Sequence, residues 1–227
     1  MIDTLLFDLD NTLLDFDKAE ANAITRALGD VGISVTNEMR DCYHKINLAQ
    51  WKLLEQGKMT REEVKMRRFK LLFQEFDIKA SPQEVAKHYQ DYLGQGHYFI
   101  EGAEEVLQEL SKRFRIYLVT NGTLSVQRGR LKSSGIEKYL QGVFISEEIG
   151  YNKQSIEYFE KCFSKIPDFK KENTAIIGDS LSSDIQGGIN AGIKTIWFHR
   201  AQDLTEDPQP KPDYEINSLK SLLKMLK

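Results

Sequence analysis

The stretch Thr4-Leu5-Leu6-Phe7-Asp8-Leu9-Asp10-Asn11-Thr12-Leu13-Leu14-Asp15 decides the fold of this 227-residue chain. Its short apolar run, closed by an acid, is typical of a buried parallel strand. Asp8 and Asp10 follow where that strand would end, at the edge where open α/β sheets bind ligands. Two carboxylates so close repel each other and need a cation or a shared proton. On this stretch alone, a solvated turn at Asp10-Asn11 remains an equal alternative.

Composition limits the class of protein. The chain is 41% hydrophobic and 29% charged, as is ordinary for globular proteins, and its net charge of −3 gives no reason to expect binding to a nucleic-acid polymer. No apolar run approaches the roughly 20 residues that span a bilayer, and the acidic start predicts no signal peptide, so we expect no membrane attachment.

Cys42 and Cys162 lack CxxC spacing, which favours reduced thiols and a cytoplasmic location. The four histidines show no metal-ligand spacing and are interpreted as structural or surface residues.

Residues 16–97 are expected to be helical throughout. Asp17 and Glu20 have the spacing of a helix start, and a second helix is expected over about 37–56. Thr60–Glu63 and Ser81–Glu84 are capping boxes that open two more helices. The pattern predicts four helices without a strand, inserted between the first strand and the rest of the chain.

From Gly102 onward, apolar strand patterns alternate with helical ones. Strands are expected at 115–120, 143–145, 174–177 and 194–198, with an edge strand at 213–216 after a proline-containing loop at 203–211. The helices are expected at 102–113, 125–134, 155–164, 184–191 and near 219–226. This alternation predicts an α/β fold with a mostly parallel, Rossmann-like sheet and right-handed crossovers.

Small polar or charged residues follow four of these apolar segments, and in a parallel sheet such ends meet at one edge. They are Asp8-Leu9-Asp10, Thr120-Asn121-Gly122, Lys153, and Gly178-Asp179 with Asp184. Several carboxylates suit a hard cation such as Mg²⁺. Thr120, Lys153 and backbone amides supply donors for a phosphoryl group, and a carboxylate such as Asp8 can act as a nucleophile.

In this order, the four motifs resemble those of the haloacid dehalogenase-like (HAD) hydrolase superfamily, and the helical insert resembles the C1-type cap of its subfamily I. The resemblance covers nearly the whole chain and implies a HAD-like core of residues 1–15 and 98–227 with a cap of residues 16–97. More narrowly, Leu118 to Gly122, Gln127 to Leu131 and Ile145 to Gly150 are similar to the nucleoside 5′-monophosphatases of that subfamily.

The resemblance also implies a role for each matching residue. Asp8 would be the nucleophile, and Asp10 the general acid and then the general base. Thr120, Asn121, Gly122 and Lys153 would bind the phosphoryl group, and Lys153 would neutralise charge. Mg²⁺, for which Mn²⁺ could substitute, would bind the Asp8 carboxylate, the Asp10 backbone carbonyl and Asp179. Asp184 would orient a metal-bound water or Lys153, although as an alternative it only caps its helix.

The expected activity is hydrolysis of a small phosphomonoester, a nucleoside 5′-monophosphate, by a monomer or weak homodimer. The nearer alternative is a phosphatase for phosphoglycolate or sugar phosphates. A haloacid dehalogenase needs no metal or second acid, so Asp10 and Asp179 argue against that activity. A binding protein of the same fold without catalytic activity is a further alternative. Gln154 departs from the family, which commonly has proline after the lysine. In the cap, Trp51, Arg67 and Arg68 either contact substrate or are a core tryptophan and solvated arginines.

Overall fold

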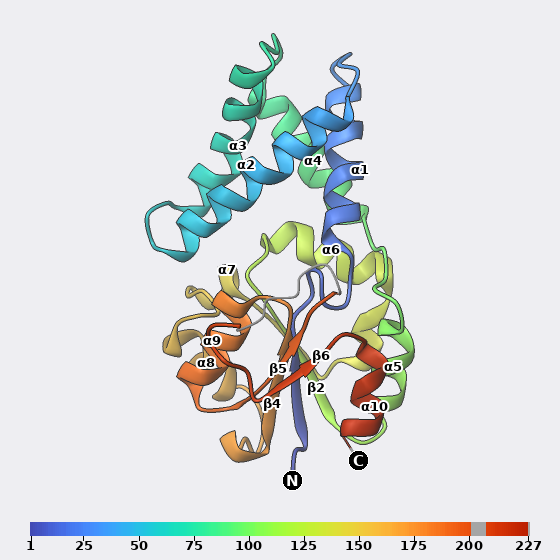
Figure 1. The fold of residues 1–227 in the computed structure, drawn as a ribbon, viewed down its shortest axis with the longest axis vertical. Helices are drawn as coiled ribbons and strands as arrows, with labels where there is room; N and C mark the ends of the chain where they lie inside the picture. The colour runs from blue at the N-terminus through green and yellow to red at the C-terminus, as the bar shows by residue number, and fades with distance from the viewer. Residues whose placement is uncertain (201–207, 227) are drawn as a thin grey trace.

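The structure is a computed structural model that describes residues 1–200 and 208–226. Its centre is a six-stranded parallel sheet in the order β3-β2-β1-β4-β5-β6 (Figure 1). The strands are β1 (Thr4–Phe7), β2 (Arg115–Thr120), β3 (Gly142–Ile145), β4 (Thr174–Gly178), β5 (Lys194–Phe198) and β6 (Tyr214–Ile216). The expected α/β class and parallel sheet are therefore confirmed.

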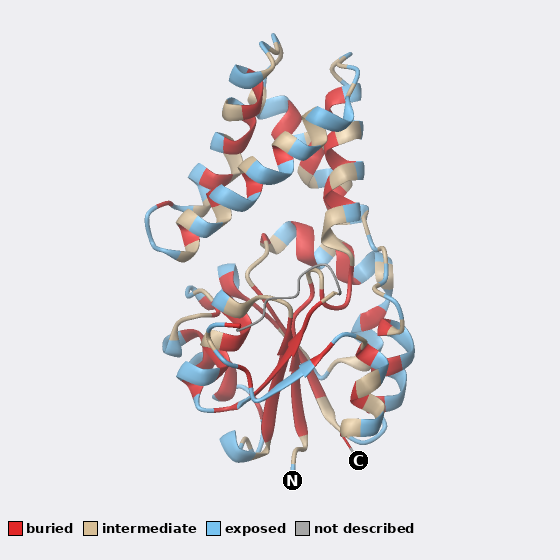
Figure 2. Cartoon of the chain, in the orientation of Figure 1, coloured by how far each residue is buried: buried red, intermediate tan, exposed pale blue. Residues whose placement is uncertain are grey.

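Helices cover both faces of the sheet. They are α5 (Ala103–Leu110), α6 (Leu124–Ser134), α7 (Ser146–Ile149), α8 (Ile156–Phe163), α9 (Gln186–Ala191) and α10 (Leu222–Met225). Leu5 and Phe7 of β1 pack in one core cluster with residues of α5 and α10, whereas Leu6 faces the opposite cluster with residues of α8. This alternation buries β1 on both faces, as Figure 2 shows for the strands at the centre of the sheet.

The segment between β1 and β2 is helical, as expected. It contains α1 (Phe16–Gly29), α2 (Asn37–Glu55), α3 (Arg61–Glu75) and α4 (Pro82–Gln95). Both capping residues expected from the sequence work as N-caps, because Thr60 accepts from the amide of Glu63 and Ser81 from that of Glu84. These helices share their own apolar cluster, which stands beyond the carboxyl ends of the strands (Figure 1). We propose residues 16–97 as the cap and residues 1–15 and 98–227 as the core.

Three segments differ from the sequence-based expectation. The short helix α7 follows β3 directly and was not expected. The helix expected at 184–191 begins earlier, as a π-helical turn at Leu181–Ile185 that continues into α9. The final helix is a 3₁₀ turn at Leu219–Ser221 followed by the short α10. Of the loop expected at 203–211, residues 203–207 lie outside the part of the chain that the structure describes. None of the described helices is long and apolar enough to cross a membrane.

Candidate active site

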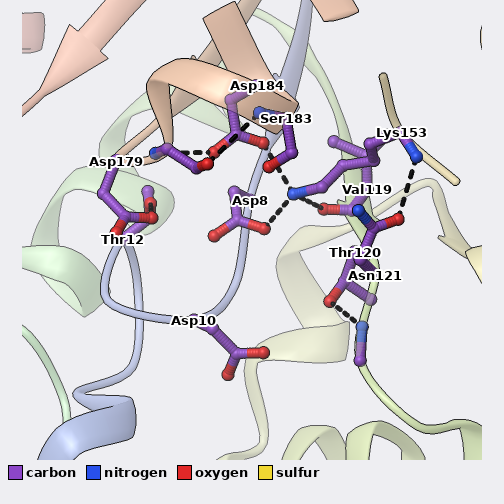
Figure 3. Close-up of polar contacts among 12 residues, drawn as sticks. Asp8, Asp10, Thr12, Val119, Thr120, Asn121, Lys153, Asp179, Ser183 and Asp184 are labelled. Carbon is purple, nitrogen blue, oxygen red and sulfur yellow. Dashed lines mark hydrogen bonds and ion pairs between the residues drawn. The ribbon is translucent and has the colours of Figure 1, made fainter. Parts of the chain in front are cut away.

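The ends of three neighbouring strands bring the first site residues together. β1 lies between β2 and β4, with Phe7 opposite Leu118 and Ile177. Asp8 directly follows β1, Thr120 ends β2, and Asp179 follows β4. These residues therefore meet at the carboxyl edge of the sheet, as the sequence predicts (Figure 3).

Lys153 enters this edge from the loop that follows α7. Its Nζ donates to Asp8, to Asp184 at 2.6 Å and to the carbonyl of Val119 at 3.4 Å (Figure 3). The side chain is almost completely buried. Burial alone would lower the pKa of Lys153, but the carboxylates of Asp184 and Asp8 raise it overall, so the residue is a fixed cation.

Three acids surround that cation, and carboxylate oxygens of Asp8, Asp179 and Asp184 lie within 4.8 Å of one another. Burial raises the pKa of Asp8 to about 7 against the opposing effect of Lys153. Burial and the neighbouring Asp8 raise the pKa of Asp179 well above its ordinary value. One lysine therefore does not compensate the three acids. An all-oxygen donor set with excess negative charge fits a hard divalent cation such as Mg²⁺.

Asp10 turns its side chain away from these three acids (Figure 3). One carboxylate oxygen accepts from Gln127 at 2.7 Å, and the other accepts from Arg130. The Asp10 carboxylate is more exposed to the pocket than the carboxylate of Asp8. The Asp10 carboxylate thus lies apart from the three acids, and its expected role in proton transfer and the contact of its backbone carbonyl with metal stay predictions.

The loop Thr120-Asn121-Gly122 forms the next side of the site. The amide of Gly122 donates to Thr120 Oγ1 at 3.1 Å, and Asn121 Oδ1 accepts from the backbone amide of Lys153 at 2.9 Å. A Cβ on Gly122 would lie 2.1 Å from Gln127 Nε2, so only glycine lets Gln127 bond Thr120 and Asp10 at once. Among the described residues, Nδ2 of Asn121 has no partner. The loop can therefore donate hydrogen bonds to an anion.

Asp184 lies in the π-helical turn, completely buried. Its Oδ2 accepts from the backbone amide of Ser180 at 3.1 Å, while Oδ1 faces Lys153. A Cβ on Gly178 would lie 2.2 Å from Asp184 Oδ2, so glycine at the end of β4 makes room for this carboxylate. Asp184 thus holds the amine of Lys153 beside Asp8, which is more than a helix-capping role. π turns often occur at functional sites.

The cap supplies the other wall of the pocket above Asp8. Trp51 and Arg68 both line this pocket, whereas Arg67 is exposed. Further lining residues from the cap, to which the sequence analysis gave no role in a site, are Glu20, His44, Asn47, Leu48, Glu55 and Gln90. The substrate cavity is therefore shared between the core motifs and the inserted helices.

The cap also bonds directly to the loops that carry the core motifs. Arg61 donates to the carbonyl of Asn121 at 2.6 Å and to Ser146 Oγ at 2.8 Å. Gln154, which stands where the family commonly has proline, donates from Nε2 to the carbonyl of Glu55 at 2.7 Å. In this chain, the departure from the family pattern thus provides a contact between the lysine loop and the cap.

Gln127 and Arg130 are site residues to which the sequence analysis gave no role. Both lie on α6 three residues apart, a spacing that places two side chains on the same helix face. Arg130 is completely buried and also donates to the carbonyl of Gly96 at 2.9 Å, where the cap joins the core. Both residues lie in the stretch Gln127 to Leu131 that resembles the nucleoside 5′-monophosphatases, and their helical spacing in the helix after β2 is the signal that places them on one face.

Comparison with known proteins identifies the class. The model of the haloacid dehalogenase-like hydrolase family matches residues 5–198. The chain is 41% identical over 224 residues to the HAD-hydrolase YfnB of Bacillus subtilis, covering 98% of this chain and 94% of YfnB. The chain therefore belongs to the haloacid dehalogenase-like hydrolases, and the resemblance stated from its motifs is confirmed.

Two further relatives are similar over their whole length. Pyrimidine 5′-nucleotidase PynA of Streptococcus pneumoniae is 42% identical, with 98% of this chain and 94% of PynA covered. Pyrimidine 5′-nucleotidase YjjG of Escherichia coli is 26% identical, with 99% and 97% covered. Among solved structures, the crystal structure of YfnB superposes on this chain with a TM-score of 0.93 at 40% sequence identity. The match covers 100% of this chain and 99% of YfnB, and that structure is described as bound to magnesium.

Proposed function

We propose that this protein is a Mg²⁺-dependent phosphomonoesterase that hydrolyses nucleoside 5′-monophosphates, with pyrimidine nucleotides as the substrate class, through a phosphoaspartate intermediate. The observation that carries the proposal is the position of Asp8, a buried carboxylate held by Lys153 beside two more acids and the donor loop at Thr120. The names of the relatives PynA and YjjG support the nucleotide class.

Asp8 and Asp10 divide the chemistry. An oxygen of Asp8 forms a bond to phosphorus while the bond from phosphorus to the 5′ oxygen breaks, and Asp10 gives that oxygen its proton. Asp10, now ionised, takes a proton from water, whose oxygen attacks phosphorus and releases Asp8 and inorganic phosphate. Gln127 and Arg130 hold the two oxygens of Asp10 at the pocket during both steps.

The phosphoryl group is bound by donors from two loops. Thr120 Oγ1 and Asn121 Nδ2 provide hydrogen bonds, and the amide of Gly122 orients the Thr120 hydroxyl. The Lys153 ammonium offsets the negative charge that accumulates in the transition state. Because Lys153 N bonds Asn121 Oδ1, these two loops keep a fixed spacing. Because these donors are already in position, they stabilise the charge of the transition state better than water molecules would.

Asp8, Asp179 and the backbone carbonyl of Asp10 would hold Mg²⁺, with Asp184 orienting Lys153. When bound, the cation supplies Lewis-acid stabilisation of phosphoryl oxygens. Thr12 Oγ1 donates to Asp179 at 3.3 Å, and this contact orients the acid toward the site. The magnesium-bound structure of YfnB supports this choice of ion, and we expect Mn²⁺ to substitute.

The nearest alternative is a phosphatase for phosphoglycolate or sugar phosphates, because the phosphoryl site is the same for all these esters. A panel assay decides between them. We expect uridine and cytidine 5′-monophosphates to give the highest kcat/KM with Mg²⁺, and activity to disappear under excess chelator and return when Mg²⁺ is added back. A higher kcat/KM for phosphoglycolate or a sugar phosphate would overturn the proposed substrate class, and full activity after verified metal removal would overturn the metal requirement.

A further inference from the structure

Four polar residues of the cap form a connected group in the wall of the active-site pocket, which we call the cap polar cluster: Glu20, His44, Asn47 and Arg68. They come from three different helices, α1, α2 and α3. Glu20, Asn47 and Arg68 are each 2–3% exposed. A buried polar group contributed by several helices costs desolvation energy and needs a compensating set of hydrogen bonds.

Asn47 is the centre of this cluster. Its Nδ2 donates to Glu20 Oε1 at 2.6 Å, and its Oδ1 accepts from Arg68 at 2.8 Å. The second oxygen of Glu20 is 2.6 Å from His44 Nδ1. A side-chain amide has two donor hydrogens and two acceptor lone pairs, so these bonds leave Asn47 with one of each. Its orientation is fixed because a carboxylate and a guanidinium hold it from opposite ends.

Charge in the pocket disfavours a second anionic group on the substrate. Among the described residues that line it, the positively charged side chains are Lys153 and Arg68, and His44 gains a charge only when protonated; each of the three has a partner. The carboxylates are more numerous and include Asp17, Glu20 and Glu55 in addition to the acids at the metal site. The guanidinium of Arg68 lies over the rings of Phe69 and Tyr89, and Asn47 connects it to Glu20. An uncharged leaving group therefore fits this part of the pocket better than a carboxylate or a second phosphate.

Apolar side chains complete the space around the cluster. Leu48 and Trp51 of α2 and Leu93 of α4 line the same pocket. Apolar walls with a few fixed polar groups suit a flat ring that carries donors and acceptors on its edge. The edge of a pyrimidine base places an acceptor next to a donor at N3 and at the exocyclic group on C4. A carboxamide with one free donor and one free acceptor can pair with such an edge. Because N3 donates in uracil and accepts in cytosine, a fixed amide pairs with the two bases in different poses.

We propose that the cap polar cluster is the base-binding site, in which Asn47 hydrogen-bonds the edge of the pyrimidine ring while Glu20 and Arg68 act as positioning residues that hold the Asn47 amide. This proposal rests on the proposed function, and it names Asn47 as the residue by which the site distinguishes a nucleotide from other phosphate esters. A site built to hydrogen-bond a substrate group discriminates strongly against a substrate that lacks it.

The test compares uridine 5′-monophosphate with ribose 5-phosphate, which is the same ester without the base. We expect Asn47→Ala to lower kcat/KM for the nucleotide by about 10–100-fold, the range for a lost hydrogen bond with a buried group left unpaired. For ribose 5-phosphate, we expect a change of less than about 3-fold, because this substrate does not use the amide. Inhibition by the product nucleoside uridine should weaken in parallel, whereas inhibition by inorganic phosphate should stay the same.

Gln50→Ala is the matched control. Gln50 lies on α2 one turn after Asn47 and is also buried, but it is not among the residues that line the pocket. Arg68→Met tests positioning, and it should reproduce the loss on the nucleotide while sparing ribose 5-phosphate. Thermal melting of every variant separates folding from binding, and Asn47→Ser replaces Asn47→Ala if the alanine variant does not fold.

The outcomes separate this proposal from the proposed function. If the wild-type protein hydrolyses uridine 5′-monophosphate no better than ribose 5-phosphate, the proposed function fails, and the base site fails with it. If the wild-type protein prefers the nucleotide but Asn47→Ala loses activity equally on both substrates, or on neither, the proposed function stands and the base site is overturned. If Arg68→Met loses activity mainly on phosphoglycolate, Arg68 reads an anionic group and the base assignment is wrong.

Discussion

At the scale of single residues, the site depends on an imbalance of charge around Asp8. Asp8, Asp179 and Asp184 are crowded at the end of the sheet, and Lys153 is the cation that bonds two of them. Crowding of this kind costs free energy in the absence of metal, because neighbouring carboxylates repel each other and have lost most of their hydration. A divalent cation beside these acids would offset the repulsion, because it supplies a compensating positive charge.

The first prediction concerns the nucleophile. Asp8→Asn should lower phosphate release from a nucleotide by at least about 10³-fold, because an amide is a poor nucleophile and one metal ligand is weakened. The variant should remain folded, since asparagine has the same shape as aspartate. Steady-state phosphate release and circular dichroism melting measure the two effects. Activity close to wild type in a folded variant would show that the covalent mechanism is wrong.

The second prediction links metal binding to pH. The pKa of Asp8 is raised to about 7 and that of Asp179 is also raised, so below pH 7 protons compete with Mg²⁺ for these oxygens. The apparent Mg²⁺ affinity should therefore rise between about pH 5 and pH 7, by about tenfold per pH unit for each proton released. Calorimetric titration at several pH values measures this directly. An affinity that does not change with pH would contradict the assigned ligands.

Stability of the metal-free protein should change in the opposite direction. An acid with a raised pKa keeps its proton in the folded state at a pH where the unfolded chain has lost it. The free energy of unfolding therefore falls as pH rises from the unfolded value near 4 to the folded value near 7. Added Mg²⁺ should raise the melting temperature more at pH 7.5 than at pH 5.5, and Asp8→Asn should reduce this difference.

At the scale of elements, α3 connects the cap to the loop that follows β2. Arg61, the first residue of this helix, bonds the carbonyl of Asn121 and the hydroxyl of Ser146. Lys65, one turn later, contacts Glu147 at the start of α7. The N-terminal end of α3 thus contacts both the loop after β2 and the start of α7, so the position of the cap is linked to the position of that loop.

The third prediction tests this connection. Arg61→Ala should lower kcat/KM by about 10-fold, chiefly through a higher KM, because the closed cap loses hydrogen bonds to the core while the chemical groups stay in place. Arg67→Ala is the control, since Arg67 lies on the same helix but is exposed. Kinetics of both variants with one nucleotide substrate suffice. Equal losses in the two variants would indicate a general effect on α3 instead of a contact with the core.

At the scale of the whole molecule, the insertion point of the cap determines how the site can work. The chain enters the cap directly after Asp8–Asp15 and leaves it before α5 (Figure 1). The two connections lie side by side, because the amide of Asp15 donates to the carbonyl of Tyr98 and the amide of Ile100 to that of Leu13. Asp15 caps α1 at one connection, and Gly96 accepts a hydrogen bond from Arg130 at the other. A helical lid attached in this way can close over the phosphate site and exclude water.

The fourth prediction follows from this arrangement. Replacing residues 16–97 by the cap of a sugar-phosphate phosphatase should change the order of substrate preference, because the phosphoryl pocket of the core is common to all phosphomonoesters. The phosphoaspartate chemistry should remain, and it can be checked by trapping the phosphorylated protein. Values of kcat/KM across nucleotides and sugar phosphates measure the change. An unchanged order in a folded, active chimera would show that loops of the core select the substrate.

The sequence by itself determined the architecture and the motif residues. Apolar runs such as Leu5–Phe7, each followed by polar residues, predict parallel strands with a site at their carboxyl ends, and the sheet confirms this pattern. Capping residues such as Thr60 and Ser81 located the starts of cap helices. These features are readable because strand burial, helix capping and polar strand ends depend on residues that are neighbours in the chain.

Only the tertiary structure decided which distant side chains meet. The bonds of Gln127 and Arg130 to Asp10 span more than 115 residues of sequence, and the contact of Gln154 with Glu55 joins a core loop to the cap. No periodicity encodes such pairs, because they depend on how helices and loops pack after the sheet has formed. For the same reason, the sequence left open whether Arg68 was solvated, whereas packing of α3 against α2 and α4 buries it beside Asn47 in the wall of the pocket.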